Sequence, residues 1–149
     1  MTLLIDYKKA RLRYTVIETF QAGIELSGAE VKALRAKHGK LDGSRVIIRA
    51  GEAFVVGMQI PPYQQANTPA GYDPARTRKL LLKKKEIAEL GEAEERKGLT
   101  VVPIEVYNNG RYVKVRVAIV RGKGKADKRE DLKLKDAKRE MDRVLKRRN

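Results

Sequence analysis

The sequence contains no cysteine and no tryptophan, and its only histidine is His38. Without cysteine the chain can form no disulfide, no thiolate zinc site and no cysteine nucleophile, which suits a reducing compartment. No apolar run approaches the ~20 residues that a membrane-spanning helix needs. The first six residues are too short and too weakly basic to form a signal peptide. We therefore expect a cytoplasmic protein that does not span a membrane.

Groups that could support catalysis are also scarce. His38 lies near the end of an expected helix and has no cysteine partner, so solvation explains it better than a role as a general base. Residues 121–125 lack the glycine spacing of a phosphate-binding loop and the Ser or Thr that should follow its lysine. Acidic residues 92, 94 and 95 fit the solvated face of a helix. We expect neither an enzyme nor a protein with a cofactor, a metal or a small-molecule substrate.

Positive charge is what the sequence has in excess. The chain holds 34 Lys+Arg against 19 Asp+Glu, a net charge of +15, and its sequence pI is near 10.1. Such a surface favours a polyanionic partner, because binding to phosphates releases condensed counterions. Nucleic acid is the favoured partner class and an anionic membrane surface comes second. The length of 149 residues suits one packed core.

The clearest local pattern lies between Gly23 and Gly39. Ser27 and Glu30 form a capping box that predicts the start of a helix. Gly39 fits the left-handed position that commonly ends a helix. The helical spacing separates the apolar residues from the basic ones, which are Val31 and Leu34 on one face and Lys32 and Arg35 largely off it. The sequence thus predicts a basic helix fixed against neighbouring strands.

Strand signals recur along the rest of the chain. Alternation or β-rich composition marks six candidates in three pairs: 14–20 with 24–26, 45–49 with 53–60, and 102–106 with 113–119. Residues 1–13 show no clear period and predict a loose basic arm, residues 64–74 predict a loop, and residues 78–97 predict a helix. We expect a mainly β protein with two to three helices, folded as a small antiparallel barrel of the oligonucleotide-binding (OB) type.

The C-terminal residues differ in character from the rest. Residues 121–149 hold 13 Lys+Arg and 6 Asp+Glu, and neither Gly nor Pro occurs after Gly124. Leu134, Ala137 and Met141 are spaced like one narrow helix face. An isolated helix this weakly apolar is marginal in water. We therefore divide the chain into a barrel, residues 1–122, and a basic tail, residues 123–149, that is disordered when free and helical on a partner.

Basic residues interleaved with aromatic ones point to RNA. Single-stranded or looped RNA is held by a cationic surface, with aromatic rings stacking on unpaired bases. The candidate cations recur in the arm, the first helix and the exit of the long loop: Lys8, Lys9, Arg11, Lys32, Arg35, Lys37, Arg76, Arg78 and Lys79. Three tyrosines could stack, Tyr7, Tyr63 and Tyr72, although packing at the barrel rim is favoured for each one taken alone.

Several ordered blocks resemble one family. They are the run Gly-Ile-x-Leu-x-Gly-x-Glu-Val-Lys-x-Leu-Arg from Gly23, Asp73-Pro74 followed by Arg76, Arg78-Lys79-Leu80-Leu81-Leu82, Lys97-Gly98-x-Thr100-x-Val102-Pro103, Asp127-Lys128-Arg129, and Asp136-Ala137-Lys138-Arg139-Glu140. Together they resemble the signature of the small protein B (SmpB) family, the bacterial partners of transfer-messenger RNA (tmRNA), along nearly the whole chain.

The resemblance implies a role in rescuing ribosomes. A member of this family would bind the tRNA-like domain of tmRNA with its OB-like barrel and deliver it to ribosomes stalled without a stop codon, so that trans-translation tags the incomplete polypeptide. Its tail would enter the empty messenger channel and become helical there. The implied partners are tmRNA and the ribosomal RNA of the decoding region and the messenger channel, and the protein would be monomeric on the RNA.

The resemblance also assigns residues by matching position. The implied RNA-binding set is Lys8, Lys9, Arg11, Lys32, Arg35, Arg76, Arg78 and Lys79, and the implied ribosome-binding tail residues are Lys123, Lys125, Asp127, Lys128, Arg129, Lys138 and Arg139. Four positions depart from the family pattern: Tyr7 replaces Asn, Gln21 replaces Glu, Lys83 often replaces His, and Ala126 replaces an aromatic residue or His. Without an aromatic group at residue 126, docking of the tail would rely more on charge.

Two other classes of function remain open at this point. A structural or assembly protein of the ribosome would share the basic, cysteine-free composition and the barrel with a tail. An RNA-processing enzyme would need a constellation of acid, base and metal ligands that the sequence lacks. A membrane-surface role is the weakest alternative, because the apolar face of the tail is narrow and carries neither Trp nor Phe.

Overall fold

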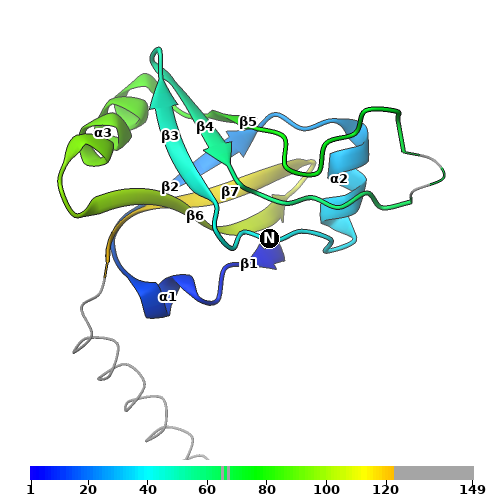
Figure 1. Cartoon of the computed structure of the whole chain (residues 1–149), viewed down its shortest axis with the longest axis horizontal. Coiled ribbons are helices and arrows are strands. Elements are labelled where there is room, and N and C mark those ends of the chain that lie inside the picture. The colour runs from blue at the N-terminus through cyan, green and yellow to red at the C-terminus, as the bar shows by residue number, and fades with distance from the viewer. Residues whose placement is uncertain (65, 67, 123–149) are drawn as a thin grey trace, which may run out of the picture.

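The computed structural model describes residues 1–64, 66 and 68–122. This part of the chain contains seven antiparallel strands and three helices (Figure 1). The strands are β1 (Thr2–Asp6), β2 (Tyr14–Ile24), β3 (Arg45–Arg49), β4 (Glu52–Val56), β5 (Arg78–Leu81), β6 (Leu99–Asn109) and β7 (Tyr112–Gly122). The helices are α1 (Ala10–Arg13), α2 (Gly28–Arg35) and α3 (Lys84–Glu95). The expectation of a mainly β protein with helices is confirmed.

One sheet contains all seven strands, in the order β1-β6-β7-β2-β5-β4-β3. The long strand β2 pairs with β7 over most of its length and with β5 only at its end, through Gly23 and Ile24. The sheet bends there, so that β3, at one edge, packs close to β6 near the other edge. Hydrogen bonding does not close this curved sheet, which makes it a partly closed barrel.

Helix α3 covers the open side between β3 and β6 (Figure 1). The backbone N–H of Ile48 on the edge strand β3 donates to Glu94 Oε2 of α3 at 3.0 Å. Arg49 Nη1 reaches Glu94 Oε1 at 2.7 Å. A free strand edge can pair with another chain, and a covering helix prevents this. Glu94 therefore completes the barrel where the strands leave it open.

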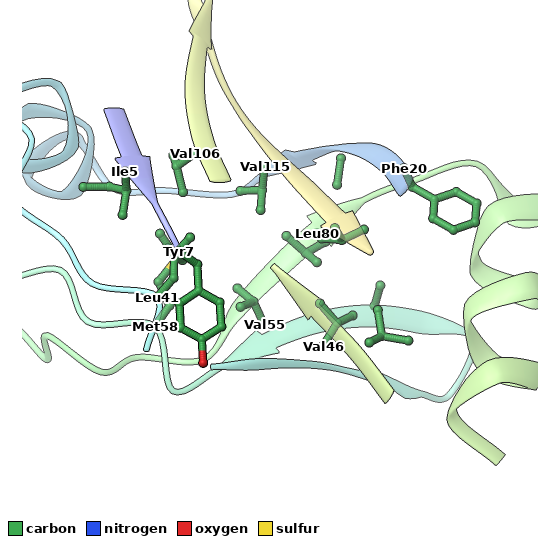
Figure 2. Packing of buried hydrophobic residues seen from close by; sticks show 14 of the residues in the cluster. Ile5, Tyr7, Phe20, Leu41, Val46, Val55, Met58, Leu80, Val106 and Val115 are labelled. Atoms are coloured by element: carbon green, nitrogen blue, oxygen red, sulfur yellow. The ribbon is translucent and has the colours of Figure 1, made fainter. Parts of the chain in front are cut away.

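The core fills the space inside the bent sheet. Figure 2 shows its side chains pointing inward from strands on both sides, among them Val46 and Val55 from the β3–β4 hairpin and Val106 and Val115 from the β6–β7 hairpin. Phe20 closes the core near α3. Figure 1 places α2 and α3 at opposite ends of the barrel, so α2 is free to present a surface of its own.

The two hairpins form where the sequence predicts them. Residues 45–56 turn at Ala50 and Gly51, which have φ values of 52° and 73°. Residues 99–122 turn after Asn109, and Gly110 has a φ of 62°. Such left-handed positions suit short hairpin loops. The strand predicted for residues 53–60 stops earlier, at Val56, because Gly57 turns the chain away with a φ of 80°.

Three other expectations are wrong. Residues 1–13 do not form a loose arm, because Leu4, Ile5 and Ala10 are buried and β1 pairs with β6. Residues 78–81 form strand β5 instead of the start of a helix. The expected turn at residues 21–23 is absent, because β2 runs through them to Ile24. The structure thus adds β1 and β5 to the six predicted strands and joins the predicted strands 14–20 and 24–26 into β2, which gives seven strands.

Candidate nucleic-acid interface

Helix α2 begins with the predicted capping box. Ser27 Oγ accepts from the backbone N–H of Glu30 at 3.2 Å, and Glu30 Oε1 accepts from the backbone N–H of Ser27 at 2.8 Å. Ala33 and Leu34 are fully buried, whereas Lys32 and Arg35 are exposed. The helix therefore presents two neighbouring cations to solvent while its opposite face joins the core.

The helix does not end at Gly39 as predicted. Lys37 takes the left-handed position with a φ of 64°, and its N–H donates to the carbonyl of Leu34 at 2.8 Å. The N–H of His38 donates to the carbonyl of Ala33 at 2.9 Å, which completes a Schellman motif. Gly39 serves a different purpose, because a Cβ there would lie 3.1 Å from Leu34 Cδ2.

Glu30 also ties α2 to the chain that precedes β5. Its Oε1 accepts from Arg76 Nη2 at 2.6 Å, and its Oε2 accepts from Arg78 Nε at 2.5 Å. Burial alone would raise the pKa of Glu30, but the hydrogen bonds from Arg76, Ser27 and Arg78 outweigh it and lower that pKa to about 2. The same ion pair raises the pKa of Arg76. The carboxylate is therefore ionised at neutral pH and holds both arginines.

The structure removes Arg78 from the candidate RNA contacts. Its side chain has no solvent exposure, and besides Glu30 it donates to the carbonyls of Met58 at 2.8 Å and Pro74 at 3.1 Å. Every direction of its guanidinium is thus used inside the protein. Arg76 differs, because its side chain is 45% exposed and lies at the surface beside α2. Arg78 is the first residue of β5, whereas Arg76 lies in the chain before that strand and stays at the surface.

A groove of about 850 Å³ lies along the exposed side of α2. Lys32 and Arg35 line it from the helix, and Tyr63 and Pro69 line it from the long loop. The ring of Tyr63 is exposed and its centroid lies 5.8 Å from that of His38. Phosphates could lie against the two cations while an unpaired base stacks on the tyrosine ring. These groups combine charge and stacking in one place.

Two of the three candidate tyrosines are held inside the protein. Tyr7 is 3% exposed, lies within the core as Figure 2 shows, and its hydroxyl accepts a long hydrogen bond from Arg13 Nη1 at 3.4 Å. Tyr7 is therefore packed inside the protein and is not available to stack on RNA. Tyr72 is half-buried and donates from its hydroxyl to the carbonyl of Ile60 at 2.7 Å, and burial raises its pKa.

The remaining predicted cations do not join the α2 groove. Lys8, Lys9 and Arg11 are exposed around the start of α1, where Lys9 Nζ lies 3.9 Å from Asp42. Lys79 lies on β5 and pairs with Glu52 at 3.0 Å, and that hydrogen bond raises its pKa. Figure 1 shows that α1 and α2 are well separated. The predicted tail residues, from Lys123 to Arg139, lie outside the described residues.

A second surface next to α2 was not predicted. Leu81 and Tyr112 are 50% and 69% exposed, and they line a groove of about 320 Å³ with Lys114 and Arg111. Lys114 Nζ lies 5.7 Å from the centroid of the Tyr112 ring. Arg35 Nη2 donates to the carbonyl of Arg111 at 3.0 Å, so this groove adjoins the basic face of α2. In the sequence, this surface could have been found from Tyr112 and Lys114, which are two residues apart after the hairpin turn and therefore lie on the same face of the strand.

Neither a metal-ion cluster nor a membrane-spanning helix is found among the described residues. Within residues 1–64, 66 and 68–122, no three acidic or histidine side chains gather to hold a metal ion. No helix in the same part of the chain is long and apolar enough to cross a membrane. The α2 groove is the candidate site, and its two cations and exposed tyrosine ring suit an anionic partner with unpaired bases.

Comparisons with known proteins agree with the resemblance in the sequence. The family model for the SmpB protein matches residues 4–147. An SsrA-binding protein of Microcystis aeruginosa is 45% identical over 145 residues, which cover 97% of this chain and 94% of the relative. An SsrA-binding protein of Listeria welshimeri is 47% identical over 147 residues, which cover 98% and 94%.

A solved structure is similar as well. It is described as "tmRNA-SmpB: a journey to the center of the bacterial ribosome", and its matching chain is 44% identical with a TM-score of 0.67. The match covers 81% of this chain and 85% of that chain. The family model spans nearly the whole chain, and the relatives are similar along nearly their full length. This chain therefore belongs to the SmpB family.

Proposed function

We propose that this protein binds the tRNA-like domain of tmRNA and delivers it to stalled ribosomes for trans-translation. The observation that carries the proposal is the groove in which Lys32 and Arg35 of α2 face the exposed ring of Tyr63. Membership in the SmpB family, SsrA-binding relatives and a similar chain in a tmRNA–SmpB structure support it. The protein acts by recognition in the cytoplasm and performs no covalent chemistry.

The geometry suggests how the surface recognises RNA. The side chain of Lys32 makes no ion pair or hydrogen bond with the described residues, so it is available for a phosphate. Arg76 is fixed by Glu30 at the edge of α2 and still exposes almost half of its side chain. Tyr112 and Lys114 extend the surface beyond Arg35. Backbone contacts position the RNA, and rings that stack on unpaired bases favour a folded RNA with loops over a plain duplex.

The two parts of the chain divide the work. Residues 1–122 bind tmRNA as one monomeric barrel, and residues 123–149 bind ribosomal RNA in the decoding region and the messenger channel, where they become helical. The net charge of +6 on residues 123–149 supports this assignment, because a segment with few apolar residues can be ordered along phosphates. The candidate contacts there are Lys123, Lys125, Asp127, Lys128, Arg129, Lys138 and Arg139.

Competition binding tests the proposal. The full-length protein is titrated with its own tmRNA, with and without bulk tRNA, at two salt concentrations around the physiological value. A preference for tmRNA that persists at the higher salt is expected, because specific contacts do not depend on counterion release alone. Equal and steeply salt-dependent binding to both RNAs would contradict the proposal and favour a structural protein of the ribosome.

Charge reversal locates the interface. The double variant Lys32→Glu with Arg35→Glu should weaken tmRNA binding by about tenfold or more and lower the salt slope by about one for each lost phosphate contact. The matched control is Lys84→Glu with Lys85→Glu, which makes the same change in net charge at exposed positions of α3. Equal losses in the two variants would show that total charge matters and that α2 is not the contact surface.

A further inference from the structure

The face opposite α2 carries an apolar groove that RNA binding does not explain. The groove has a volume of about 180 Å³ and lies between β2 and α3. Its floor includes Leu99 and Ile119. Ile17, which lines the groove, is 49% exposed and the preceding residue Val16 is 41% exposed, although most large apolar residues of the described chain are buried. An exposed apolar surface next to a groove is a common feature of docking sites.

A β-bulge produces the exposed surface. Val16 pairs with Val120 and Glu18 pairs with Ile119, so Ile17 is an extra residue in β2 without a partner in β7. Bulges redirect side chains and are retained near functional sites. Here the bulge places the side chain of Ile17 along the groove. An apolar side chain of a partner could cover it.

The rim of this groove is acidic in a strongly basic protein. Glu18 from β2 and Glu89 and Glu92 from α3 line it, with Arg96 as the one cation among the lining residues. Within the described part of the chain, none of the three carboxylates has an ion-pair partner. An anionic RNA would be repelled here, whereas a segment with both apolar and basic residues would be attracted.

The chain itself supplies such a segment. Residues 123–149 contain 12 Lys+Arg and 6 Asp+Glu, and their apolar residues include Leu134, Met141 and Leu145. This segment starts at the groove, because Gly122 follows Ile119 by three residues and Arg121 pairs with Leu99 across the hairpin. The 27 residues of this segment can extend about 90 Å, so the segment is long enough to reach every part of the groove.

We propose that, in the RNA-free protein, residues 123–149 dock reversibly on the groove between β2 and α3. Apolar side chains of the segment cover Ile17, and its cations face Glu18, Glu89 and Glu92. Exposed ion pairs contribute little each, so the contact is weak and exchanges readily. A polyanion competes for the same cations and releases the segment. The groove thus keeps the basic segment from binding RNA indiscriminately, and this contact does not depend on the proposed function.

A spin label can detect the contact, since the natural chain has no cysteine. The variant Arg143→Cys carries one nitroxide at a position off the Leu134–Met141 face, and amide signals are compared before and after reduction of the label. We expect the signals of Ile17, Glu18 and Glu92 to lose at least half of their intensity while those of α2 keep theirs. Uniform intensities across the barrel would overturn the proposal.

Charge variants and mixing identify the occupant. When Glu89→Gln and Glu92→Gln are added to the spin-labelled Arg143→Cys chain, most of the lost amide intensity should return. The control pair Glu25→Gln with Glu52→Gln makes the same change in net charge and should not restore it. Equal effects of the two pairs would overturn the proposal. Isotope-labelled, cysteine-free chain mixed with unlabelled, spin-labelled chain should show no loss, since a loss would assign the contact to a second copy. Oligouridylate should restore the signals, and persistent loss would exclude the competition.

Discussion

At the scale of single residues, Glu30 shows how one side chain connects folding and function. The carboxylate is 1% exposed, and burying a charge is costly unless hydrogen bonds replace the lost water. Ser27, Arg76 and Arg78 provide these hydrogen bonds from three separate parts of the chain. Glu30 therefore starts α2, fixes the chain before β5, and holds Arg76 at the edge of the proposed RNA-binding surface.

This arrangement predicts a loss of stability in acid. The pKa of Glu30 is lowered from 4.5 to about 2 in the folded protein, so its contribution is present above pH 4.5 and is lost as the pH falls toward 2. Its size is roughly 3 kcal/mol by linkage. Glu30→Gln should lower the free energy of unfolding by about that much at pH 7 and much less at pH 2 to 3. Urea unfolding at both pH values measures this.

Glu25→Gln provides the control for that measurement. Glu25 is exposed, and its side chain has no ion pair or hydrogen bond within the described residues. Its substitution should change the free energy of unfolding by less than about 0.5 kcal/mol at either pH. If Glu30→Gln behaved like this control, the buried ion pairs would not stabilise the fold.

Only part of this residue-level picture could be predicted from the sequence. The capping box was visible because Ser27 and Glu30 are three positions apart. The pairing with Arg78 was not, because 48 positions separate it from Glu30 and no local pattern encodes such a contact. The sequence left stacking open for Tyr7 for the same reason, since its burial depends on strand and loop residues far along the chain.

At the scale of elements, local signals decided which parts were predictable. The hairpins at residues 45–56 and 99–122 have both alternating strands and turn glycines. Strands β1 and β5 have no such turn, and β1 depends on pairing with β6 and β5 on pairing with both β4 and β2. In β5 the burial of Leu80 and the exposure of Leu81 follow strand alternation, which four residues are too few to reveal.

Backbone geometry at Gly57 gives a prediction at this scale. Gly57 has a φ of 80°, and a Cβ there would lie 2.9 Å from the carbonyl oxygen of Gly43. Gly57→Ala should therefore lower the free energy of unfolding by about 1–3 kcal/mol. The matched change Gly91→Ala lies inside α3, where the nearest atom is 3.8 Å away, and should raise it by about 0.5–1 kcal/mol.

Thermal unfolding of the two variants tests this pair directly. Gly57→Ala should have a lower Tm than the natural protein, and Gly91→Ala a higher one. Similar Tm values in both variants would mean that the backbone around Gly57 shifts to accept a side chain without loss of stability. The conformation at Gly57 also bears on function, because the loop that follows it contains Tyr63, which lines the groove of α2.

At the scale of the whole molecule, charge is distributed unevenly over the surface. Cations line the α2 groove at one end of the barrel, and carboxylates line the β2–α3 groove at the other. The sequence shows the excess of +15 but not this polarity, because the two faces are assembled from residues far apart in the chain. We expect such polarity to orient the barrel on RNA, with α2 toward the phosphates and α3 away from them.

Removing residues 123–149 tests the division between the barrel and the basic segment. Strand β7 pairs with β2 as far as Gly122, so the shortened chain retains every described strand and should keep its Tm within a few degrees. Its tmRNA affinity should stay within a few-fold, whereas rescue of stalled ribosomes should be lost. Circular dichroism, competition binding and a peptide-tagging assay measure the three properties. A shortened protein that unfolds would place the segment in the core, and one that still rescues ribosomes would leave residues 123–149 without the proposed role.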